Sequence, residues 1–208
     1  MSAFQRDDQG KIRAVFTSQE SHVLQNLTEQ LLELLGEGTS SISPEADPFL
    51  HLVGFGANEA PPEDPVLRRL LPSAYDDPAA ASEFRRYTEH GVRMKKRSHV
   101  MMIYEALLPQ DDDWNAEKPL DLSSIEISIH EDDVMDWLAA LNDLRLALAV
   151  RLGIESDDGP RGVKNEVQSK KFELMKEDDP MKAVYAVYNW LGSIQHSLIE
   201  AITPEHPQ

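Results

Sequence analysis

The period of hydrophobic and polar positions changes several times along the chain, and each period predicts a different kind of element. Residues 12–16 alternate between apolar and more polar side chains just after Gln9-Gly10, which is typical of a strand that follows a hairpin turn. Residues 123–130 alternate again, with three isoleucines on one face. Because two strands alone are only marginally stable, we expect the N-terminal hairpin and this central strand to form one small antiparallel sheet.

Helical spacing of apolar residues covers much of the remaining chain. The first helix should follow the sequence TSQE at 17–20, which fits a capping box, and should end at Gly36. A short helix is expected over 65–71, and aspartate-proline pairs predict helix starts at Pro78 and Pro180. The three long helices after the first are expected over 78–108, over the second half of 123–154, and over 180–202.

The helix over 78–108 carries one row of mostly apolar residues at helical spacing. Such a row usually holds an amphipathic helix on a core, so we expect it to be buried. Its members are Phe84, Tyr87, Gly91, Met94, Met101 and Leu108.

These elements together predict an α+β fold, a helix-dominated single domain over 1–208 in which the small sheet packs on long helices. Two stretches lack a regular period and predict a long polar loop and a loop or weak helix. The expected order is a hairpin and first helix over 1–36, the polar loop over 37–64, a basic-faced long helix over 78–108, a strand and central helix over 123–154, the loop or weak helix over 155–179, and a C-terminal helix over 180–202.

Composition narrows the chemistry that the chain can perform. It has no cysteine, which excludes disulfides, thiolate nucleophiles and cysteine metal sites. Its seven histidines form no metal-binding pair at helical spacing, and it has no nucleophile elbow or phosphate-binding loop. We therefore expect no enzyme, with no catalytic residue, metal or cofactor. The chain also has neither a long apolar run nor a secretion signal, so we expect a cytoplasmic protein without a membrane span.

Charge singles out one segment. The net charge of −17 disfavours non-specific binding to phosphate backbones, yet residues 85–97 are densely basic. On a helix, four of them share one face, namely Arg86, His90, Arg93 and Arg97. This face either binds an acidic partner or an anion, or is a solvated face neutralised by acidic neighbours. Direct DNA binding is less favoured, because aromatic side chains are not interleaved with the basic ones.

The central helix carries polar residues inside an apolar run. Arg145 projects into the apolar face with Asn142 at its edge, whereas Asp143 and Arg151 project towards the opposite side. A buried guanidinium needs a partner. Arg145 and Asn142 therefore either bind groups of a neighbouring segment and fix the packing, or form an anion pocket in which Arg145 is the bidentate donor.

Three segments carry a family resemblance. The run DWLAALNDLRLAL at 136–148, which continues into RLGI at 151–154, together with YDDP at 75–78 and EFRR at 83–86, resembles the AosR family. These are actinobacterial regulators of transcription that respond to oxidative stress, and they were long catalogued as a domain of unknown function. The resemblance covers nearly the whole chain up to Ile154 and the final helix.

The resemblance implies a non-enzymatic cytoplasmic regulator of transcription that acts through protein contacts with a sigma factor or RNA polymerase. The redox switch of the family is placed on a cysteine pair near the N terminus. The present chain has no cysteine there, so a disulfide switch cannot operate within it. Two alternatives stay open: a small-molecule or anion sensor with Arg145 in a pocket, and direct DNA binding through 85–97. Homodimerisation is a further open question.

Overall fold

The computed structural model describes residues 3–7, 10–36, 60–108, 124–154, 172, 174–176 and 178–203. The α+β fold expected from the sequence is confirmed. The strands are β1 (Gln5–Arg6), β2 (Ile12–Thr17) and β3 (Ser124–Ile129). The helices are α1 (Ser18–Leu35), α3 (Pro65–Leu70), α4 (Pro78–Ala106), the short 3-10 helix η2 (Glu131–Asp133), α5 (Val134–Leu152) and α7 (Pro180–Ile202).

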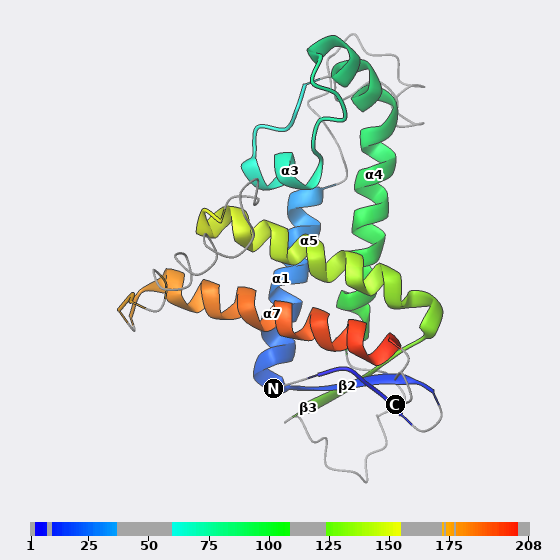
Figure 1. The fold of residues 1–208 in the computed structure, drawn as a ribbon, viewed down its shortest axis with the longest axis vertical. Helices are drawn as coiled ribbons and strands as arrows, with labels where there is room; N and C mark the ends of the chain where they lie inside the picture. Colours follow the sequence, from blue (N-terminus) through cyan, green and yellow to red (C-terminus); the bar gives the residue numbers. More distant parts are fainter. Residues whose placement is uncertain are drawn as a thin grey trace.

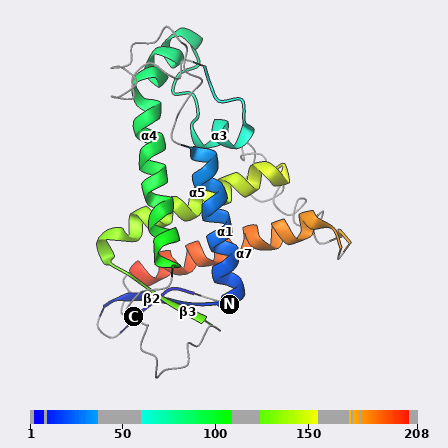
Figure 2. The same cartoon turned by 180° about the vertical axis from the view of Figure 1, so that it is seen from behind.

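Two pairs of helices cross one another next to the sheet. α1 and α4 lie side by side, while α5 and α7 form a second layer across them (Figure 1). In the view from behind, the sheet lies near the N-terminal end of α1, whereas α3 lies near the C-terminal end of α1 (Figure 2). α5 contacts α1, α3, α4 and α7. It is therefore the helix through which the other elements are connected.

The small antiparallel sheet has the order β1-β2-β3. Ile12, Ala14 and Phe16 of β2 pair with the three isoleucines of β3 in register, and these residues of β2 are buried. The alternation in the sequence thus predicted both strands and the face that each one buries. Gly10 has a φ of 80° in the turn between β1 and β2, a conformation that glycine adopts without a steric penalty.

Helix starts follow the local sequence. The Thr17 side chain accepts a hydrogen bond from the Glu20 backbone, and the Glu20 side chain accepts one from the Thr17 backbone, which confirms the predicted capping box. Asp64, Asp77 and Asp179 cap the helices whose first residues are prolines. The sequence therefore predicted these boundaries correctly, because each cap depends on residues within one turn.

The core lies where the two helix layers and the sheet meet. Leu24 of α1, Ile103 of α4, Leu141 of α5 and Leu198 of α7 are completely buried. Phe16 joins this core from the sheet and is also completely buried. The same core therefore holds both helix layers and the sheet together, and it determines which side of each helix faces inward.

The predicted buried row of α4 is wrong. Five of its members are exposed to solvent: Gly91, and Phe84, Tyr87, Met94 and Leu108, with exposed fractions of 43%, 54%, 45% and 36%. The buried face in the N-terminal half of α4 instead carries Arg85, Glu89 and Arg93. The physical reason is that this half passes the C-terminal ends of α1 and α3, where backbone carbonyls accept hydrogen bonds from arginines.

The two irregular stretches fall largely outside the described residues. Of the predicted loop over 37–64, the structure describes only 60–64, which lead into α3. Of the stretch over 155–179, it describes 172, 174–176 and 178–179.

Candidate functional site

The four basic residues predicted to share one face of α4 do not form one surface. His90 is exposed and Arg86 is half-buried. Arg93 is only 7% exposed, and Arg97 is half-buried with its guanidinium bonded to α1. The structure therefore separates the group into an outer part and an inner part.

The inner part bonds to the C-terminal end of α1. Arg93 Nη1 donates to the Leu35 carbonyl at 2.9 Å, and Arg97 Nη1 donates to the Leu32 carbonyl at 2.7 Å. The last turn of α1 has no basic residue of its own. The last carbonyls of a helix lack partners within the helix and carry partial negative charge. Arginines of α4 therefore supply donors and positive charge that α1 itself lacks.

A buried carboxylate connects two of these arginines. Glu89 lies between Arg85 and Arg93, with side-chain distances of 2.5 Å and 2.6 Å. Arg85 Nη2 also donates to the Leu71 carbonyl at the end of α3, at 3.2 Å. Each guanidinium thus bonds to both a carboxylate and a backbone carbonyl. This arrangement satisfies charges that would be costly to bury alone.

The solvent-facing side of the same half of α4 carries a row of large apolar side chains among polar ones. Phe84, Tyr87 and Met94, here called the outer stripe, are all exposed. The Phe84 ring packs edge-on against Tyr75 with centroids 5.6 Å apart. Arg86 lies over the Tyr87 ring at 4.8 Å and donates to its hydroxyl. The outer stripe is therefore an exposed row of large side chains with a cation attached to it.

The polar residues of α5 have different surroundings. Asp143 is buried and accepts from Lys96 Nζ at 2.7 Å and 3.0 Å, although the sequence placed it opposite the apolar face. The expected face was too narrow, because α4 covers the Asp143 side of α5 as well. Asn142 is exposed. The structure thus does not bring Asn142 and Arg145 into a common enclosed site.

Arg145 is held by neutral groups of α7. Its Nη1 donates to Gln195 Oε1 at 2.7 Å, and its guanidinium lies 5.1 Å from the centre of the Tyr188 ring. A Cβ on Gly192 would lie 3.5 Å from the guanidinium. Arg145 Nε is buried and has no hydrogen-bond partner in the part of the chain that the structure describes. These contacts favour a role in joining α5 to α7.

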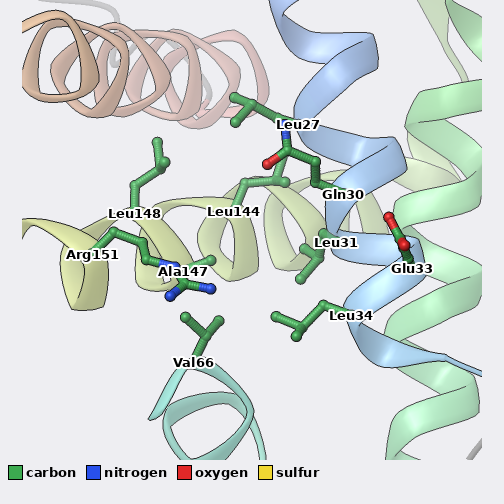
Figure 3. A pocket seen from close by; sticks show the side chains of 10 residues that line it. All are labelled: Leu27, Gln30, Leu31, Glu33, Leu34, Val66, Leu144, Ala147, Leu148 and Arg151. Atoms are coloured by element: carbon green, nitrogen blue, oxygen red, sulfur yellow. The ribbon is translucent and has the colours of Figure 1, made fainter. Parts of the chain in front are cut away.

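A groove lies on another side of α5, between α1, α3 and α5. It has a volume of about 470 Å³. Leu27, Leu31 and Leu34 line it from α1, and Leu144, Ala147 and Leu148 line it from α5. Figure 3 shows the Arg151 guanidinium next to Ala147 and Val66, with Glu33 away from it across the groove. This apolar groove with one cation was not predicted from the sequence, because its walls come from three separate segments.

The described ranges show neither a metal site nor a membrane span. These ranges contain no group of three or more histidine, aspartate or glutamate side chains placed to hold a metal ion. No described helix is long and apolar enough to cross a membrane. The features that stand out are thus the outer stripe and the groove, and both are suited to binding.

Comparison with known proteins agrees with the resemblance seen in the sequence. The chain is 30% identical over 203 residues to the protein named oxidative stress regulator AosR of Mycobacterium tuberculosis, and the match covers 92% of this chain and 82% of the relative. It is 31% identical over 207 residues to the putative oxidative stress regulator AosR of Mycobacterium leprae, with the same coverage. No solved structure matches the chain. Residues 1–202 match the family described as domain of unknown function DUF2017, and the chain belongs to this family.

Proposed function

We propose that this protein is a non-enzymatic regulator of the oxidative-stress response that acts by binding a protein of the transcription machinery, a sigma factor or RNA polymerase. The names of its relatives support the regulatory role in oxidative stress. The single structural observation that favours protein contact as the mechanism is the outer stripe of α4. Such a role places the protein in the cytoplasm.

The outer stripe has the properties of a protein-binding surface. Its three side chains are 43–54% exposed and follow one another along one side of a helix. Contiguous exposed apolar surface is uncommon on monomers and often marks an interaction site, and aromatic side chains contribute strongly to such contacts. The stripe therefore supports binding to a partner with an apolar surface of its own.

The charges beside the outer stripe favour an acidic partner. Arg86, His90 and Lys95 lie on the outward part of α4, in a chain whose net charge is −17. They outnumber Glu83, an acidic residue exposed in the same half of the helix. Local positive charge can steer a partner of opposite charge, while the overall field repels nucleic acid. Arg93 and Arg97 bond to α1, so the outer surface keeps fewer cations for phosphate contacts than the sequence predicted. Protein contact is thus favoured over direct DNA binding.

The absence of cysteine limits how this chain can take part in an oxidative-stress response. A chain without thiols cannot sense oxidants through a disulfide of its own. We therefore assign to this chain the binding step, and any oxidant sensing by it would have to use a group other than a cysteine.

Quantitative affinity purification from the native host tests the proposal. The test variant carries Phe84→Gln, Tyr87→Gln and Met94→Gln, because glutamine keeps helix propensity and removes apolar surface. The control carries Met135→Gln and Ile199→Gln, which are exposed apolar residues on α5 and α7. We expect sigma factor or RNA polymerase subunits with the wild type and the control, before and after peroxide treatment, and their loss with the test variant.

Binding between purified proteins then separates direct from indirect contact. A sigma factor or polymerase recovered from the host should bind the purified wild type and not the outer-stripe variant. Equal binding by both would remove the role of the outer stripe. Recovery of neither a sigma factor nor polymerase under either condition would contradict the proposed function itself.

A further inference from the structure

We infer that the groove between α1, α3 and α5 is a binding site for an amphipathic carboxylate, a small molecule with an aliphatic chain and an acidic head group that pairs with Arg151. This inference goes beyond the proposed function, because it concerns a different surface and a different class of ligand.

The walls of the groove suit an aliphatic chain. Seven of its ten lining residues are aliphatic, and they come from all three helices. Its volume of about 470 Å³ lies within the range of roughly 300–1,000 Å³ that is typical of small-molecule sites. The size therefore suits a small ligand.

Arg151 is available for an acidic head group. Its side chain is 57% exposed, and its acidic partner among the described residues is Asp64, 3.8 Å from Nη2. That distance is too long for a hydrogen bond. The other carboxylate oxygen of Asp64 accepts hydrogen bonds from the backbone of Val66 and Leu67, which keeps this carboxylate at the start of α3. A ligand carboxylate could thus form the bidentate pair that Asp64 does not form.

The charge distribution gives the ligand one orientation. Glu33 lines the groove away from Arg151 (Figure 3) and repels a carboxylate there. Asp64 lies 3.8 Å from Arg151 but does not line the groove, so the Arg151 end is the one that attracts a carboxylate. The aliphatic chain would then extend along the leucines of α1. Arg145, the anion-binding candidate from the sequence, does not line this groove and donates to Gln195. Arg151 therefore fits the anion-binding role better than Arg145.

Calorimetric titration of the purified full chain with decanoate, below its micellar concentration, tests the inference directly. We expect binding at one site, with weaker binding of 1-decanol because it cannot form the charged pair. Shortening the acid to octanoate should weaken binding by about fourfold per methylene group removed.

Two variants locate the site. Arg151→Gln should weaken decanoate binding by about tenfold or more and abolish the preference over decanol. Ala147→Leu fills the groove from a half-buried position and should weaken binding of both probes. Arg69→Gln, which changes an exposed arginine on α3, should leave both affinities unchanged. Thermal unfolding of each variant checks that it is folded. If Ala147→Leu does not fold, the titration of Arg151→Gln still tests the site.

Several results would overturn the inference. They are no decanoate binding at millimolar concentration, equal affinities for decanoate and decanol, or full affinity in Arg151→Gln. If Ala147→Leu abolished binding of a sigma factor while decanoate did not bind the wild type, the groove would be a protein-contact surface instead. The titrations contain no partner protein, so their outcome is independent of the proposed function.

Discussion

Arg93 of α4 donates from Nη1 to the backbone carbonyl of Leu35, 2.9 Å away at the end of α1. The two residues are 58 positions apart in the sequence. Arg93 also pairs with Glu89, which pairs in turn with Arg85. The most basic stretch of an acidic chain therefore has a structural role on its inner side, while its outer side stays exposed to solvent.

Arg93→Met should destabilise the protein strongly. The substitution leaves Glu89 with one ion-pair partner fewer and removes the hydrogen bond to Leu35. Breaking a buried pair by removing one partner costs about 3–5 kcal/mol. Urea unfolding at neutral pH measures the change, with exposed His90→Gln as the control, which should stay within about 0.5 kcal/mol of the wild type. A loss below about 1 kcal/mol for Arg93→Met would contradict the structural role.

Met94 and Ile103 lie on the same helix, and they should respond in opposite ways to truncation. Ile103 is completely buried, whereas Met94 is 45% exposed. We expect Ile103→Ala to lower the free energy of unfolding by about 2–5 kcal/mol and Met94→Ala to change it by no more than about 0.5 kcal/mol. Similar losses for both would mean that the outer stripe is buried in the protein in solution.

The ion pair between Lys96 and Asp143 should show measurable coupling. Asp143 is buried and accepts from Lys96 at 2.7 Å, so Asp143→Asn leaves the ammonium without its charge partner. A double-mutant cycle with Lys96→Met should give a coupling energy of about 0.5–3 kcal/mol, the range found for residues in contact. Additive effects of the two substitutions would show that this pair does not link α4 to α5.

Gly192 provides a test of how α5 packs on α7. A Cβ at this position would lie 3.5 Å from the Arg145 guanidinium, which is ordinary van der Waals contact. Gly192→Ala should therefore stabilise α7 by about 0.5–1 kcal/mol through helix propensity. Gly192→Leu should destabilise the protein, because a larger side chain must displace Arg145. Thermal unfolding of the two variants distinguishes these effects, and stabilisation by both would show that Arg145 does not pack against Gly192.

Some of the site could have been anticipated and some could not. The row Phe84, Tyr87, Met94 was visible in the sequence at helical spacing, but its apolar character predicted burial. The arginines at 85, 93 and 97 were equally visible, but nothing near them shows that they bond to the ends of other helices. Burial of α4 was therefore assigned to the wrong face.

The sequence by itself determined the elements, because their causes are local. The capping box at Thr17 and Glu20, the aspartate-proline starts and the alternation in β3 each depend on residues within one turn or one strand. Only the tertiary structure decided which face of α4 is buried and which cation of α5 stays available. Those outcomes depend on the positions of the carbonyls of α1 and α3 and of the side chains of α7. Folding brings these groups next to α4 and α5 from distant parts of the sequence.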